Sequence, residues 1–156
     1  MRVIFLDFDG VLNGAVSDAA RDPGLPWGTE VWYSEQLDAD KVERLNAIVD
    51  ATGAVVVLST SWRKALPTEK LRRLLQAKGF KGFILGTTPS LDRDSDGGWR
   101  YRAHEIEQWV RAAGVSDFVI LDDLPMHHLS SRLVQTSDIH GLLDEHVEAA
   151  IRMLQG

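Results

Sequence analysis

The chain of 156 residues contains no cysteine. Without thiols it can form no disulfide bond, use no thiolate nucleophile and build no zinc site on sulfur. The absence also suits a reducing compartment, so we expect a cytoplasmic protein.

Long apolar runs are missing too, although hydrophobic residues make up 44% of the chain. No run approaches the roughly 20 residues that a membrane-spanning helix requires. The first apolar run, Val3 to Leu6, is too short for the core of a signal peptide and is followed at once by Asp7. We therefore expect neither a membrane span nor a secretion signal.

Positive charge is scarce, because 17 Lys and Arg residues face 23 Asp and Glu residues, for a net charge of −6. A protein that holds nucleic acid by bulk electrostatics normally carries a basic face, and that class is not expected here. A protein that contacts only the phosphorylated end of a nucleic acid remains compatible with this balance.

Apolar runs alternate with helical periods along the chain, which is typical of an α/β domain with a mainly parallel sheet. No repeat or linker interrupts the pattern, so we expect a single domain over residues 1–156. The expected strands cover residues 3–6, 54–58, 83–85, 118–121 and 133–134. The expected helices cover residues 40–51, 67–78, 103–113 and 144–154.

Two local signals add detail to this pattern. Asp40 and Glu43 predict a capping box at the start of the first helix, and Gly53 predicts its end. Residues 90–98 are polar and glycine-rich, which predicts a mobile loop.

Polar side chains follow three of the expected strands. Asp7 and Asp9 come after the first strand, Ser59 after the second, and Asp122 and Asp123 after the fourth. The carboxyl ends of parallel strands meet at the ligand crevice of such sheets, so these groups should converge there. A single aspartate at a strand end often only caps a turn. Four together would repel one another unless a cation lay among them, and all-oxygen ligands beside phosphate favour Mg²⁺.

These segments resemble signatures of the haloacid dehalogenase-like superfamily. Residues 5–13 (FLDFDGVLN) resemble its first signature, residues 56–59 (VVLS) its second, and residues 119–123 (VILDD) its fourth. Shorter motifs resemble the branch called the HAD domain of Swiss Army Knife RNA-repair proteins. They lie at residues 59–63, 86–89, 102–106, 133–136 and 141–142.

The resemblance covers the whole chain and implies a Rossmann-like three-layer α/β sandwich. Members of this superfamily insert cap domains after the first or second strand. Residues 10–37 are too few for a large helical cap, so we expect a flap or minimal cap and an open crevice.

The resemblance also implies roles for the acidic residues. Asp7 is expected to attack phosphorus, to form an aspartyl-phosphate and to bind Mg²⁺. Asp9 is expected to act as general acid and base while its backbone carbonyl binds the metal. Asp123 is the better candidate for a direct acidic ligand, with Asp122 orienting water or a cation.

Phosphate binding is expected from the residues around these acids. Ser59 should donate a hydrogen bond to a phosphoryl oxygen, with Thr60 as the alternative, and Gly10 lies in the turn that follows Asp7. The lysine that normally balances the acidic cluster of this superfamily is missing before the fourth strand. Arg102 is the natural substitute, since a guanidinium can bind phosphate and a carboxylate together.

Other residues leave alternatives open. Arg100 competes with Arg102, and Arg63 either reaches the phosphate or forms a surface salt bridge. His127 and His128 follow Asp123, but magnesium prefers oxygen, so we expect them beside the crevice rather than on the metal.

Three further features complete the expectation. His104 is expected on the surface, and Trp62 and Trp109 in the core. We expect Trp27, Trp32 and Tyr33 to form a local apolar cluster, the alternative being rings presented to a nucleic-acid base.

Together these observations predict a magnesium-dependent phosphomonoester hydrolase. Its substrate is expected to be a phosphorylated 3′ or 5′ end of a nucleic acid, or alternatively a nucleotide or another small metabolite. A catalytically silent binding domain of the same fold is the alternative from another class. The sequence specifies neither the substrate nor the oligomeric state.

Overall fold

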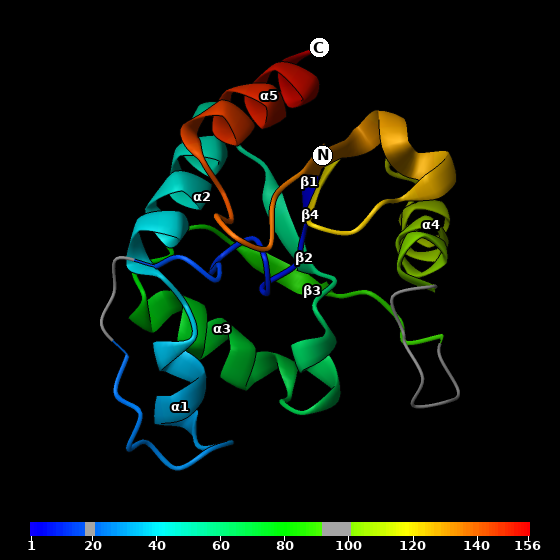
Figure 1. The fold of residues 1–156 in the computed structure, drawn as a ribbon. Helices are drawn as coiled ribbons and strands as arrows, with labels where there is room; N and C mark the ends of the chain where they lie inside the picture. The colour runs from blue at the N-terminus through cyan, green and yellow to red at the C-terminus, as the bar shows by residue number, and fades with distance from the viewer. Residues whose placement is uncertain (18–20, 92–100) are drawn as a thin grey trace.

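A parallel sheet forms the centre of the molecule, seen in a computed structural model that describes residues 1–17, 21–91 and 101–156 (Figure 1). Within these residues the sheet has five strands in the order β3-β2-β1-β4-β5, all parallel. They are β1 (Arg2–Leu6), β2 (Val55–Leu58), β3 (Ile84–Thr87), β4 (Asp117–Asp122) and β5 (Leu133–Gln135).

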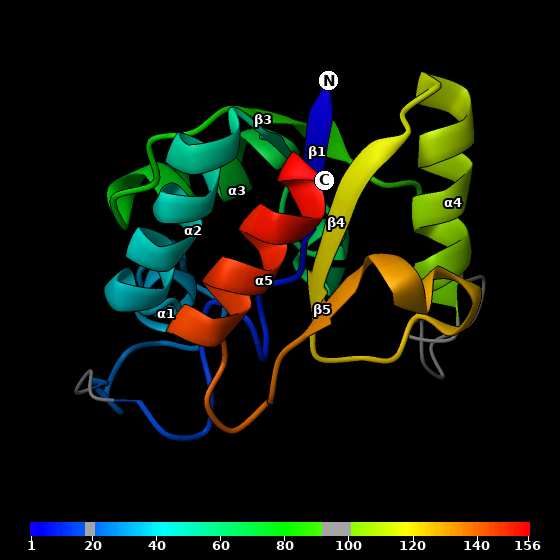
Figure 2. The same ribbon diagram turned by 90° about the horizontal axis from the view of Figure 1, so that it is seen from above.

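Helices cover both faces of this sheet (Figure 2). On one face lie α2 (Ala39–Thr52), α3 (Thr68–Ala77) and α5 (Asp144–Gln155), with α1 (Glu30–Glu35) beside α3. On the other face lie α4 (Arg102–Ala113) and the 3₁₀ helix η3 (His127–Arg132), while η1 (Ser61–Lys64) follows β2. The predicted three-layer, Rossmann-like sandwich is therefore confirmed.

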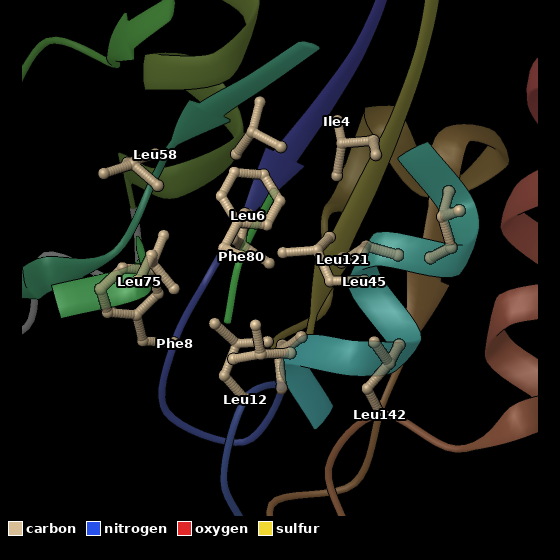
Figure 3. Close-up of a cluster of buried hydrophobic side chains, with 14 of the residues drawn as sticks. Ile4, Leu6, Phe8, Leu12, Leu45, Leu58, Leu75, Phe80, Leu121 and Leu142 are labelled. Carbon is tan, nitrogen blue, oxygen red and sulfur yellow. The ribbon is translucent and has the colours of Figure 1, made fainter. Parts of the chain in front are cut away.

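Strand β1 shows why the sheet is covered on both sides. Ile4 and Leu6 are fully buried in the core beneath α2, α3 and α5 (Figure 3), and Val3 and Phe5 are fully buried in the core beneath α4. A strand that is apolar on both faces needs helices on both, which is the usual arrangement in parallel sheets.

The start of α2 corrects one prediction. Its N-cap is Asp38, not Asp40, and no side-chain cap bond is present. Asp38 instead accepts a 2.9 Å hydrogen bond from the Ser17 hydroxyl, and Asp40 pairs with Arg44. The predicted capping box was therefore wrong, whereas Gly53 ends the helix in the left-handed conformation as expected.

The segment after β1 contains a helix that the sequence pattern did not predict. Thr29 caps α1 by accepting a hydrogen bond from the Trp32 N–H at 3.2 Å. Of the predicted loop 90–98, residues 92–98 lie outside the described residues. In the described part of the chain, no helix is both long enough and apolar enough to cross a membrane.

Candidate active site

Polar residues end neighbouring strands along one edge of the sheet. The ladder of backbone hydrogen bonds continues one residue past the strands, because Asp7, Ser59, Thr88 and Thr136 each donate to a carbonyl of the adjacent strand at 2.9–3.0 Å. In this register Asp122 at the end of β4 lies next to Asp7. The predicted convergence is thus present for Asp7, Ser59 and Asp122.

Three carboxylates form the acidic centre of this edge. Asp7, Asp122 and Asp123 each offer an oxygen within 4.8 Å of the others. Asp7 and Asp122 are buried, and Asp123 is half-buried. Backbone N–H groups hold two of them, since Phe8 donates to Asp7 Oδ1 at 2.8 Å and Leu124 to Asp122 Oδ1 at 3.0 Å.

The side chain of Arg102, the first residue of α4, reaches this acidic cluster. Its Nη1 lies 2.7 Å from Asp122 Oδ2 and 3.2 Å from Asp7 Oδ2, and its side chain is buried. The structure therefore brings Arg102 to the two buried carboxylates, in the place where a balancing cation was expected. The competing Arg100 lies outside the described residues.

One guanidinium does not neutralise this cluster. Burial raises the pKa of Asp122 to about 8, with the Asp7 charge adding to the rise and Arg102 opposing it. Burial also raises the pKa of Asp7, again opposed by Arg102. Burial would lower the pKa of Arg102, yet the charges of Asp7 and Asp122 raise it overall. A second cation beside these oxygens would favour their ionised forms, so the donor set fits Mg²⁺.

Gly10 makes room for Asp123. It has a φ of +80°, and a Cβ there would lie 2.5 Å from Asp123 Oδ2, so any other residue would displace that carboxylate. Its backbone groups already have partners, because its N–H donates to Asn13 Oδ1 at 2.9 Å and its carbonyl accepts from the Thr136 hydroxyl at 2.6 Å. In this structure Gly10 leaves the space that the Asp123 carboxylate occupies. A contact between Gly10 and phosphate stays a prediction.

Two buried hydroxyls at this edge have no hydrogen-bond partner in the described part of the chain. Among the described residues, nothing forms a hydrogen bond with Ser59 Oγ or Thr88 Oγ1, and both side chains are almost completely buried. An unsatisfied buried hydroxyl is costly, and an oxygen-rich ligand would satisfy it. Thr60, the alternative to Ser59, instead caps η1 by accepting from the Trp62 N–H. Thr88 was missed as a site residue, although it lies in the motif at 86–89.

This arrangement agrees with a comparison with known families. Residues 3–147 match the family described as the HAD domain in Swiss Army Knife RNA repair proteins. The chain belongs to this family. Membership implies a phosphatase-type hydrolase. No curated protein and no solved structure matched the chain.

Asp9 of this HAD domain lies apart from the three clustered carboxylates and is exposed. Two donors nevertheless hold it. Trp62 Nε1 donates to Asp9 Oδ2 at 2.9 Å, and Asn13 Nδ2 donates to Oδ1 at 3.0 Å. Sequence reasoning expected Trp62 only in the core and gave Asn13 no role, although Asn13 closes the first signature.

The guanidinium of Arg63 forms hydrogen bonds with neighbouring protein groups in this HAD domain. Its Nη1 donates to the carbonyls of Ser59 and Thr60, at 3.2 and 2.7 Å. Its Nη2 donates to Glu105 Oε2 at 2.7 Å and to the Pro89 carbonyl at 3.3 Å. The alternative of a salt bridge is present, but its expected surface location was wrong, because the side chains of both Arg63 and Glu105 are buried. Both hydrogens of each Nη atom are therefore used, whereas the buried Nε of Arg63 has no hydrogen-bond partner among the described residues. Phosphate binding by Arg63 stays a prediction.

The histidines lie away from the carboxylate cluster. His127 and His128 are exposed on η3, and neither is among the three residues of that cluster. His104, on the exposed side of α4, is a surface residue as expected.

Proposed function

We propose that the chain is a magnesium-dependent phosphomonoesterase whose nucleophile is Asp7. The observation that carries the proposal is the position of the Asp7 carboxylate. It is buried and lies 3.2 Å from the Arg102 guanidinium. The neighbouring strand β2 is followed by Ser59, whose hydroxyl has no partner among the described residues. A nucleophile, a cation and a free donor are the groups needed to attack and hold a phosphoryl group.

The proposed magnesium site consists of Asp7 and Asp123 with the backbone carbonyl of Asp9. Asp122 has protein partners at both oxygens, which suits an orienting role better than a direct ligand role. A bound Mg²⁺ would offset the charge of the phosphoryl oxygens and so let an anionic nucleophile approach.

The proposed reaction has two steps. A carboxylate oxygen of Asp7 forms a bond to phosphorus as the bond to the leaving oxygen breaks, and Asp9 gives that oxygen a proton. Asp9 then takes a proton from a water molecule, which attacks the aspartyl-phosphate, releases inorganic phosphate and restores Asp7. Ser59 and Arg102 hold the phosphoryl oxygens throughout, a task that requires fixed donors more than covalent chemistry.

We further propose that the substrate is a phosphorylated end of a nucleic acid. In the described part of residues 10–37 the only helix is the six-residue α1, which is too small to form a large cap. In this proposal the segment therefore acts as a flap. An open crevice admits a polymer end.

Aromatic rings support the same substrate class. Trp62, which bonds to Asp9, lies 5.1 Å from Tyr33 between ring centroids. Tyr33 lies 5.1 Å from Trp32, and Trp32 lies 5.8 Å from Trp27. Trp27 is 80% exposed. The rings form the expected local cluster, and its outer end is also available to stack on a base, as in single-strand binders.

Phosphate release from a panel of substrates tests the proposal. An aryl phosphate, oligonucleotides with a 3′ or 5′ phosphate, nucleotides and sugar phosphates are compared with and without Mg²⁺, with Asp7→Asn as the control. Turnover that depends on Mg²⁺ and Asp7 supports the reaction. Preference for the oligonucleotides supports the substrate, and preference for nucleotides or sugars refutes it. No turnover on any substrate would favour a catalytically silent binding domain.

A further inference from the structure

A second group of ligand atoms lies on the opposite face of the sheet from α2 and α5, between α4 and η3. His104 and Glu107 come from α4, and His128 comes from η3. Glu107 Oε2 lies 3.4 Å from His128 Nε2 and 3.8 Å from His104 Nδ1. The two imidazole centroids are 5.3 Å apart, and all three donor atoms lie within 4.8 Å of one another.

The two contacts of Glu107 are close to the ligand separations around a tetrahedral ion. Zinc bonds to nitrogen and oxygen are about 2.0–2.1 Å long, which places neighbouring ligand atoms about 3.3 Å apart. The two contacts of Glu107, at 3.4 and 3.8 Å, need only side-chain adjustments to reach that value. Both histidines are exposed enough to move, with side chains 60% and 41% exposed.

The surroundings of Glu107 orient it for this purpose. Its other oxygen, Oε1, accepts a 2.9 Å hydrogen bond from Arg111 Nη2 on the next turn of α4. Oε2 is thereby directed to the two histidines. His104 and Glu107 are three residues apart and share one face of the helix, so only His128 must come from elsewhere.

We propose that His104, Glu107 and His128 bind a divalent zinc-class ion, with a fourth position left for water. Two imidazoles and one carboxylate suit zinc, whereas the all-oxygen cluster at Asp7 and Asp123 suits magnesium. The proposal is independent of the proposed phosphatase activity. The alternative is that these three side chains contact one another without a metal.

A bound ion would join two elements that adjoin the acidic site in the chain. Arg102 opens α4 two residues before His104, and η3 follows the loop that begins at Asp122 and Asp123. An ion that binds only the folded arrangement stabilises it. Zinc should therefore raise the melting temperature of the whole chain.

Metal titration of the untagged chain tests the proposal, with millimolar Mg²⁺ present to fill the acidic cluster. Calorimetry with Zn²⁺ and visible absorption with Co²⁺ give the stoichiometry and the ligand geometry. We expect one equivalent of Zn²⁺ to bind. His104→Ala and His128→Ala should each weaken binding by at least about tenfold, by analogy with the loss of a metal's supporting groups. His140→Ala removes another exposed histidine and should change nothing.

Three results would overturn the site. One is equal zinc affinity in wild type, His104→Ala and His128→Ala. Another is binding lost in Asp123→Asn but kept in both histidine variants, which would assign the ion to the acidic cluster. The third is no binding at about 100 µM Zn²⁺, above the range of a useful site of this kind. Melting temperatures without metal show that each variant is folded, and activity with Mg²⁺ is followed separately.

Discussion

The indole N–H of Trp62 donates a 2.9 Å hydrogen bond to Oδ2 of Asp9, 53 residues earlier in the chain. The ring also packs edge-on against Phe8 at 5.0 Å. Trp62 therefore links η1 to the turn after β1 and orients the proposed general acid.

Trp62→Phe should keep most of the ring packing and lose only this bond. We expect kcat to fall about 10–100-fold with little change in KM, the scale typical of a lost positioning contact. Trp109→Phe, which alters a ring against Phe5 on the other face, serves as the control. Equal kinetics for the two variants would remove Trp62 from the mechanism.

Asp7→Asn should abolish turnover while the fold is kept. The amide has the same shape, and burial already disfavours the charged form of Asp7. We expect kcat to fall by at least about 10³-fold, as usual when a nucleophile is removed, while the melting temperature stays the same or rises. Asp50→Asn, on the exposed side of α2, is the matched control. More than about 1% residual activity would contradict a covalent role for Asp7.

His146, near the start of α5, should make the stability of the fold depend on pH. Its Nδ1 accepts a 2.9 Å hydrogen bond from the Leu143 N–H, which requires the unprotonated nitrogen. Burial lowers the pKa of His146 below 6.5; the charge of Glu145 opposes this shift and the charge of Lys41 adds to it. The unfolded chain therefore binds the proton more tightly. The stabilisation is complete above the unfolded pKa and is lost as the pH falls from about 6.5 toward the folded pKa.

His146→Gln should keep an acceptor at this position without the titration, as in a capping box. The melting temperature of wild type should drop more than that of the variant between about pH 7.5 and about pH 5.5, on either side of the ordinary histidine pKa. Parallel curves would show that His146 does not contribute.

The sheet and its helices were largely predictable from the sequence. An apolar run predicts a strand that helices must bury, and a helical period of apolar residues predicts the buried face of a helix. Every expected strand lies within two residues of its observed bounds, and the four expected helices within one. The acidic edge was predictable for a related reason. In a parallel sheet the ends of neighbouring strands meet, so Asp7, Ser59 and Asp122 had to lie side by side.

Contacts between distant side chains were not predictable in the same way. Arg63 pairs with Glu105 across 42 residues, and this pairing leaves no local pattern in the sequence. The bond between Trp62 and Asp9 is of the same kind. The helix α1 was missed because it has only six residues and none of them is buried, so no apolar stripe marks it.

Magnesium should stabilise the folded chain through Asp123. Because the cluster holds three carboxylates near one guanidinium, a cation that binds there favours the folded state by preferential binding. Millimolar Mg²⁺ should raise the melting temperature of wild type and leave that of Asp123→Asn unchanged. Asp117→Asn, at the exposed start of β4, should respond like wild type. An equal rise in Asp123→Asn would mean that the ion binds elsewhere.

Arg102 and Arg63 are both buried beside carboxylates, so the loss of either should destabilise the fold, but only the loss of Arg102 should lower turnover directly. Arg102 contacts the proposed nucleophile, so Arg102→Ala should lower kcat/KM by about 10²–10³-fold, the effect of losing one preorganised donor. Arg102→Lys should recover part of this, since the charge returns without the fork of the guanidinium. Arg63→Ala leaves Glu105 buried without its cation, which typically costs about 3–5 kcal/mol of stability. Kinetics and denaturant unfolding of all three variants check this contrast. Arg102→Ala with activity within about threefold of wild type, against the loss expected for such a donor, would end its assignment as the balancing cation.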